Sequence, residues 1–301
     1  MRVLKKKIFL TVGGSDPSGG AGIQADIRVA ERLGLYPLSV ISAVTSQNTS
    51  TFADIFPVPV KVLRTQLETL LSDITPDCVK IGMLPSPEHA ECVADTLREY
   101  GITNIVVDPL LVPTLSHQHA SKKLVAAVAR HLIPIATIVT PNLEELEVYE
   151  AVLDQNFDRL CNAYLLKGGH GKDDTITDTL YLHDEAPAAE TEDVEELPDY
   201  MYNSPSPFPT VEMHPMSKVR ETNQQIMFSS PLTIREFKHE RIDTRNTHGS
   251  GCVLSSAIAC YLALDSDPVV AVEKALTFMN DALAASKDFK LGKGTYGPSL
   301  L

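Results

Sequence analysis

A short stretch near residue 250 carries residue types whose spacing suits chemistry on an anion. Gly249, Ser250, Gly251 and Cys252 lead directly into an apolar run over residues 253–264. The glycines can adopt backbone conformations closed to other residues, and the first amides of a helix carry partial positive charge. The stretch therefore predicts an anion site at a helix start. A glycine-containing turn before a core helix explains the same residues equally well.

A second glycine-rich segment spans residues 13–22, after an apolar run at residues 8–12 that predicts a strand. It matches neither the dinucleotide fingerprint nor the phosphate-binding P-loop, since no lysine follows Gly22. It therefore predicts a loop that approaches a ligand closely in another way. Asp26 stands one turn into the following helix, on the side facing this loop. A carboxylate is also favoured there by the helix dipole alone.

Strands and helices are expected to alternate along most of the chain. This pattern predicts an α/β fold with a mainly parallel sheet covered on both faces. The expected strands are residues 8–12, 38–44, 78–83, 104–107, 137–139 and 165–166, with extended character again at 228–242. The expected helices are residues 23–33, 59–72, 88–99, 121–132, one opening at 140–145, 253–264 and 268–287.

Charged side chains follow several of these strands. Asp108, Glu145 and Lys167 each stand at a strand end or helix start, and in a parallel sheet such positions share one edge. Two carboxylates, a lysine and an anion-binding helix start suit a metal–nucleotide complex and phosphoryl transfer. Taken singly, the carboxylates could be helix caps and Lys167 a surface cation.

Composition excludes several classes of protein. The chain has 301 residues and a net charge of −13 without a basic cluster, which argues against nucleic-acid binding. No apolar run is long enough to span a membrane, and the apolar run after the basic residues 1–7 is too short for a signal peptide. Five cysteines without C-x-x-C spacing indicate a reduced, cytoplasmic setting.

Residues 184–230 differ in amino-acid composition from the rest of the chain. They are acidic, rich in proline and without a clear period. Such a composition buries little surface and predicts a partly disordered excursion from a single domain spanning residues 1–301.

Six motifs, taken in chain order, resemble the hydroxymethylpyrimidine/phosphomethylpyrimidine kinases of the ribokinase-like superfamily. They lie at residues 13–26, 47–49, 80–84, 140–145, 167–170 and 246–252. The resemblance implies a three-layer α/β/α fold and a homodimer. It also implies that ATP with Mg²⁺ phosphorylates 4-amino-5-hydroxymethyl-2-methylpyrimidine and then its monophosphate.

The resemblance also implies residue roles. The pyrimidine would contact Gly14, Ala21, Asp26, Gln47, Met83 and Leu110, and the nucleotide would contact Lys167, Asn142 and Thr247. Glu145 and Asp108 would act around the metal, and residues 249–252 would form the anion hole. Cys252 stands where most of the superfamily has an aspartate base. Because a thiol at a helix start has a lowered pKa, a thiolate base is expected there, although Cys252 could also simply pack at this position.

Two other functions fit the sequence. A pyridoxal or pyridoxine kinase would use the same fold, and a non-catalytic protein could bind a pyrimidine or vitamer. The chain departs from the family's pattern at residues 110–117, next to the expected substrate pocket, and in the excursion at 184–230. The intact Cys252, Lys167 and Glu145 favour an enzyme over a binding protein.

Overall fold

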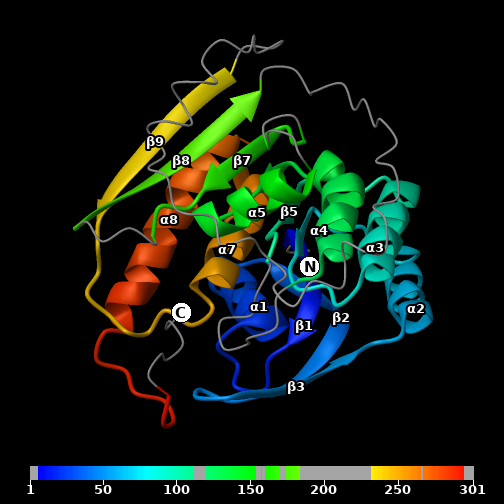
Figure 1. The fold of residues 1–301 in the computed structure, drawn as a ribbon, viewed down its shortest axis with the longest axis horizontal. Coiled ribbons are helices and arrows are strands. Elements are labelled where there is room, and N and C mark those ends of the chain that lie inside the picture. The colour runs from blue at the N-terminus through cyan, green and yellow to red at the C-terminus, as the bar shows by residue number, and fades with distance from the viewer. Residues whose placement is uncertain are drawn as a thin grey trace, which may run out of the picture.

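A computed structural model describes residues 6–110, 120–153, 157, 160–169, 174–183, 232–265 and 267–294. The expected excursion at residues 184–230 lies outside the described residues, as do His170 and residues 111–117 of the departure at 110–117. The described strands form one nine-stranded sheet with the order β3-β2-β1-β4-β5-β6-β7-β8-β9 (Figure 1).

The centre of this sheet is parallel and its two margins are antiparallel. From β2 through β1, β4, β5 and β6 to β7, neighbouring strands are parallel, whereas β3 on one side and β8 and β9 on the other are antiparallel. The strands are β1 (Ile8–Ser15), β2 (Tyr36–Gln47), β3 (Phe52–Pro57), β4 (Cys78–Ile81), β5 (Ile105–Val107), β6 (Ile138–Val139), β7 (Ala163–Leu166), β8 (Thr175–His183) and β9 (Leu232–Glu240). The predicted parallel core is confirmed, and β3 and β8 are additions to it.

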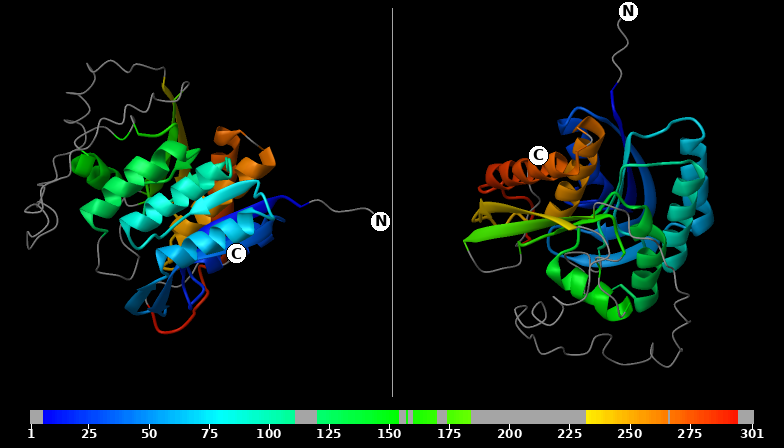
Figure 2. Two further views of the ribbon diagram at one scale, coloured as in Figure 1. Left: turned by 90° about the vertical axis from the view of Figure 1, so that its right-hand side faces the viewer. Right: turned by 90° about the horizontal axis from the view of Figure 1, so that it is seen from above.

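Helices cover both faces of the sheet, which makes three layers (Figure 2). One face carries α2 (Val60–Leu71), α3 (Pro87–Glu99), α4 (Lys122–Ala127) and α5 (Leu143–Leu153). The other face carries α1 (Gly22–Arg32), α7 (Ser250–Asp265) and α8 (Pro268–Ala285). Each layer buries its own apolar cluster against the sheet. Because β4 and β5 are covered from both sides, every residue in them is buried.

One predicted helix is shorter than expected. The sequence predicts a helix over residues 121–132, but α4 ends at Ala127 and continues as a π turn, Val128–Leu132, and a 3-10 turn, Ile133–Ile135. Pro134 has no amide hydrogen and cannot continue an α-helix. This segment lies away from the cavity described below.

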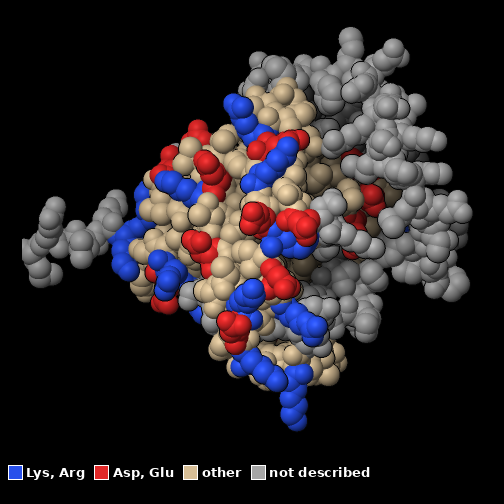
Figure 3. All heavy atoms as spheres, turned by 90° about the vertical axis from the view of Figure 1, so that its left-hand side faces the viewer, with Lys and Arg blue, Asp and Glu red and all other residues tan. Residues whose placement is uncertain are grey.

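Residues 253–260 of helix α7 are all buried, consistent with their apolar sequence. Two of its serines, Ser255 and Ser256, are fully buried and hydrogen-bonded. Across the face that carries α8 and β9, basic and acidic side chains are interspersed (Figure 3). Among the described helices, none is both long and apolar enough to cross a membrane.

Candidate active site

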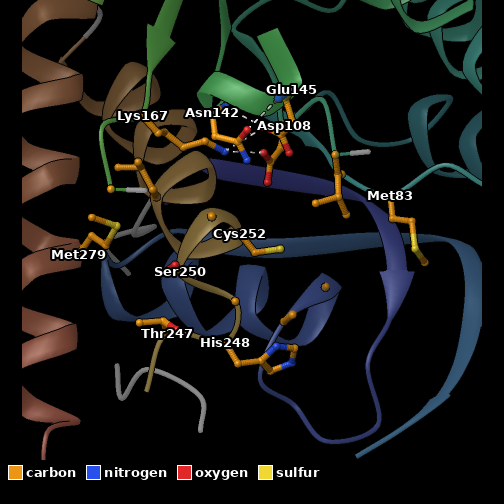
Figure 4. Close-up of a pocket in the computed structure, with 18 of the residues that line it drawn as sticks. Met83, Asp108, Asn142, Glu145, Lys167, Thr247, His248, Ser250, Cys252 and Met279 are labelled. Carbon is orange, nitrogen blue, oxygen red and sulfur yellow. Dashed lines mark hydrogen bonds and ion pairs between the residues drawn. The ribbon is translucent and has the colours of Figure 1, made fainter. Parts of the chain in front are cut away.

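A cavity of about 750 Å³ opens at the edge of the sheet where the parallel strands end. Figure 4 shows Met83 and Met279 on opposite sides of it, with Cys252 and Asp108 between them. It is lined by all but one of the residues predicted for the site: Gly14, Ala21, Gln47, Met83, Leu110, Asp108, Asn142, Glu145, Lys167, Thr247, Gly249, Ser250, Gly251 and Cys252. One cavity therefore joins the two glycine-rich loops and the charged strand ends.

The start of α7 has the geometry expected of an anion site. Gly249 has a φ of 79°, and its backbone lies so close to the Gly20 carbonyl that a side chain would overlap it. The Ser250 amide donates to the Thr247 carbonyl (3.1 Å), and α7 begins at Ser250. The amides of Gly251 and Cys252 therefore belong to the first turn of a helix in the wall of the cavity. The helix dipole favours negative charge at that position.

Lys167 lies between the two predicted metal-site carboxylates. Its Nζ atom is 3.4 Å from Asp108 Oδ1 and 3.6 Å from Glu145 Oε2. Burial raises the pKa of Glu145, with Lys167 opposing this shift and Asp108 adding to it. Burial alone would lower the pKa of Lys167, but Asp108 and Glu145 raise it above its usual value. The lysine therefore remains an ammonium ion beside the cavity.

Asn142 and Glu145 hold the start of α5 by a reciprocal pair of hydrogen bonds. The Glu145 amide donates to Asn142 Oδ1 and the Asn142 amide donates to Glu145 Oε2, each at 2.8 Å. This is the capping-box arrangement. Both residues thus have a structural role and also line the cavity. The cap fixes the carboxylate that faces Lys167.

The described residues contain no cluster of three or more histidines, cysteines or carboxylates that could hold a metal by themselves. Asp108 and Glu145 still fit Mg²⁺, which binds proteins through one or two carboxylates and completes its shell with water and substrate phosphates. The donor set therefore suits a metal that arrives with a nucleotide.

Asp26 is placed differently from the expectation. It is completely buried and is not among the residues that line the cavity. Its carboxylate accepts hydrogen bonds from Thr11 Oγ1 (2.6 Å) and Ser256 Oγ (2.8 Å). It also pairs with the fully buried Lys80, whose Nζ is 3.0 and 3.1 Å from the two oxygens. The carboxylate is thus engaged beneath the cavity, whereas Lys80 is part of the cavity wall.

The expected lowering of the Cys252 pKa is wrong for this structure. Burial raises the pKa of the thiol to about 11, because a thiolate would lose its hydration there. Lys80 opposes this shift, but Asp26 and Asp108 reinforce it. The effect of the helix start that the sequence predicts is therefore outweighed by desolvation and by two nearby carboxylates. The raised pKa favours the neutral thiol at pH 7.

Asp16 and His248 connect the two glycine-rich loops, a link that was not predicted from the sequence. Asp16 accepts hydrogen bonds from the Ser18 and Ala21 amides, each at 2.8 Å, and lies 3.2 Å from His248 Nε2. Burial opposes ionisation, but these hydrogen bonds lower the pKa of Asp16 to about 2. Both residues lie inside the motifs that carry the resemblance, which is the signal that could have singled them out.

The margin of the sheet supplies further cavity residues that the sequence did not indicate. Asp178 on β8, His239 on β9 and Arg241 after β9 all line the cavity. They lie close together only because β8 and β9 pair in antiparallel register. No local motif marks them.

Comparison with known proteins places this site in a family. The sequence profile described as phosphomethylpyrimidine kinase matches residues 16–197 and 215–299. The chain is 31% identical over 303 residues to the hydroxymethylpyrimidine/phosphomethylpyrimidine kinase of Escherichia coli, an alignment that covers 97% of this chain and 96% of that protein. This chain belongs to the phosphomethylpyrimidine kinase family. Its relatives in this family are kinases by name.

A plant relative extends the comparison. The chloroplastic thiamine biosynthetic bifunctional enzyme TH1 of Arabidopsis thaliana is 36% identical over 296 residues, which is 98% of this chain. The chain spans only half the length of that protein. The likeness therefore concerns one part of a longer relative.

Solved structures confirm the ribokinase-like fold. A phosphomethylpyrimidine kinase from Clostridium difficile superposes with a TM-score of 0.63 at 26% identity, covering 92% of this chain and 99% of that one. The pyridoxal kinase of Bacillus subtilis superposes with a TM-score of 0.72 at 24% identity, covering 98% and 97%. At that identity, the second likeness concerns the fold alone.

Proposed function

We propose that this kinase transfers the γ-phosphoryl group of ATP to the hydroxymethyl group of 4-amino-5-hydroxymethyl-2-methylpyrimidine, and then phosphorylates the monophosphate. The observation that carries the proposal is one continuous cavity. The anion loop (residues 249–252), the pair Gln47 and Met83, and the cluster of Lys167, Asp108 and Glu145 all line it. Phosphoryl transfer needs positioning and charge neutralisation, and these groups supply both.

The end of the cavity near β2 and β4 suits the pyrimidine. The Gln47 amide has a donor and an acceptor that match an aminopyrimidine edge, and Met83 offers an adaptable apolar face. Met83 packs so tightly over Gly14 that any side chain at that position would overlap its methyl group. Ala21 and Leu110 complete this end. Small residues and one methionine thus leave room for a flat ring.

The other end suits the nucleotide. Lys167, Asn142 and Thr247 line it, and the Lys167 ammonium lies close to where phosphate oxygens would meet the amides of the anion loop. Mg²⁺ held by Asp108 and Glu145, directly or through water, would neutralise developing charge on the phosphates. Cys252, at the start of α7, also lines the cavity and is the candidate to accept the proton of the hydroxymethyl group.

The test is the release of ADP from Mg-ATP in the presence of single alcohols. We expect turnover with the pyrimidine alcohol and with its monophosphate, and little with pyridoxal or pyridoxine. Turnover with pyridoxal alone would assign the protein to the alternative kinase activity. No ADP with any alcohol, in a protein that still binds them, would assign it to the non-catalytic class.

We also propose that the chain forms one kinase domain with an insertion at residues 184–230, that it works in the cytoplasm, and that it forms a homodimer. Val44 on β2 and Phe56 on β3 pair across the strands, and their side chains are 46% and 67% exposed. Such adjacent exposed apolar side chains suit contact with a second copy. Light scattering should give twice the mass of the chain, and less for Phe56→Asp. A monomeric wild-type protein would contradict the proposal.

A further inference from the structure

Asp178 has a buried carboxylate that connects the sheet margin to the end of β7. Only 3% of the residue is exposed. Its Oδ1 atom accepts a hydrogen bond from the Gly168 amide, and its Oδ2 atom lies within hydrogen-bond distance of His239 Nε2, each at 2.8 Å. A buried carboxylate without hydrogen-bond partners would cost free energy of folding. The Gly168 amide and His239 together provide a partner for each oxygen of Asp178.

The turn after β7 is held by two further contacts with the same margin. Gly168 lies against the backbone of Thr177 so closely that a side chain at 168 would overlap the Thr177 carbonyl. Arg241 Nη1 donates to the Gly169 carbonyl at 3.0 Å. The peptide groups of this turn are therefore fixed by β8, by β9 and by the residue after β9.

Lys167 immediately precedes this turn. Its amide donates to the Pro141 carbonyl (2.9 Å), and its ammonium extends toward Asp108 and Glu145. The Gly168 N–H that Asp178 accepts belongs to the peptide group between Lys167 and Gly168. Asp178 therefore fixes the orientation of the peptide group that follows Lys167. A rotation of that peptide would move the start of the lysine side chain and displace its ammonium from the carboxylates.

We infer that Asp178 and His239 are positioning residues that act through the Gly168 amide to hold Lys167 at the phosphates of the bound nucleotide. This inference rests on the nucleotide end proposed above. Asp178 orients the peptide, and His239 keeps the Asp178 carboxylate in place by occupying its second oxygen.

The first experiment is calorimetry with Mg²⁺ and a non-hydrolysable ATP analogue, without any alcohol. We expect Asp178→Ala to raise the Kd for the analogue about tenfold, the scale of a lost buried hydrogen bond. Asp178→Asn retains an oxygen for the Gly168 amide and should restore most of the affinity. The matched control is Asp174→Asn, an exposed residue just before β8 that does not line the cavity.

Steady-state kinetics then separates positioning from general stability. Asp178→Ala should raise the KM for ATP and lower kcat, with the KM for the alcohol within about twofold of wild type. A lowered Tm with an unchanged analogue Kd would overturn the inference, because that is what a purely structural role produces. If Asp178→Ala does not fold, His239→Ala is measured instead, and an unchanged Kd in that variant overturns the inference equally.

Failure of the inference and failure of the proposed function give different results. If the wild-type protein phosphorylates none of the alcohols, the proposed function fails, but the analogue Kd still tests the role of Asp178. If the alcohols are phosphorylated and the Kd does not respond to Asp178→Ala or His239→Ala, only the positioning role fails.

Discussion

At Cys252, two local influences on the thiol oppose each other and burial prevails. The position at the start of α7 and the nearby Lys80 favour a thiolate, while burial and the carboxylates of Asp26 and Asp108 favour the thiol. With a pKa of about 11, only a small fraction is thiolate at neutral pH. If Cys252 accepts the proton, the rate of phosphoryl transfer must depend on the fraction of Cys252 that is thiolate.

We therefore expect kcat to rise with pH between about 7 and 10, since the thiolate fraction grows tenfold per pH unit below the pKa. Cys252→Ala should lower kcat by about 10²–10⁴-fold, the usual contribution of a general base, and leave the Kd for the alcohol nearly unchanged. Cys252→Asp should recover part of the rate and remove this pH dependence. Steady-state pH profiles of the three proteins are the measurement. Near-full kcat in Cys252→Ala would mean that the thiol only packs.

Gln47 gives the second prediction for a single residue. Gln47→Ala should raise the KM for the pyrimidine alcohol while the KM for ATP changes little, because Gln47 belongs to the part of the cavity proposed for the pyrimidine and not to the part proposed for the nucleotide. The loss of one hydrogen bond inside a pocket costs about 1–3 kcal/mol. An unchanged KM for the alcohol would remove Gln47 from the pocket.

At the scale of elements, the strands and helices with a local hydrophobic pattern were predicted from the sequence. The strands that form only by pairing with a distant segment were missed. The apolar runs of β1, β4 and β5 predicted parallel strands because such strands are buried on both faces. Strand β3 is mostly exposed and β8 pairs with β9 across the long excursion, so neither has a local signature of its own.

The site divides in the same way. Positions at strand ends, such as Asp108 and Lys167, follow from the alternation of elements and were predicted to share one edge. The pairing of Asp26 with Lys80 joins residues 54 positions apart, and the Cys252 pKa depends on burial and on charged groups from other elements, Lys80, Asp26 and Asp108. Neither could be predicted from local sequence, because both arise only when the layers pack.

The loop before α7 provides the third prediction. Gly249→Ala should abolish most kinase activity and lower Tm, because φ is 79° and the new methyl group would overlap the Gly20 carbonyl. Gly101→Ala is the matched control: its φ is 63°, but open space surrounds it. We expect that control to lose about 1 kcal/mol of stability and keep full activity. Equal activity losses in both variants would show that backbone strain, and not the close approach of the two loops, matters at Gly249.

At the scale of the molecule, the two strands that border the excursion are direct neighbours. His183 at the end of β8 is paired with Leu232 at the start of β9, and the pairing continues without a break to Thr175 and Glu240. The proposed nucleotide end of the cavity would depend on this pair of strands, since Asp178 and His239 come from them. The distance between His183 and Leu232 is one that a short hairpin loop bridges.

We therefore expect a protein in which residues 185–229 are replaced by a Gly-Asn pair to fold and to retain kinase activity. Asp184, Ser230 and Pro231 remain and, with the added pair, form a five-residue loop between strands already in register. Hairpins tolerate loops of that length, and a shorter loop lowers the entropy cost of joining the strands. Thermal unfolding and the KM for ATP are the measurements. Loss of a cooperative transition would place residues 185–229 in the core, whereas a raised KM for ATP with unchanged Tm would place them over the nucleotide.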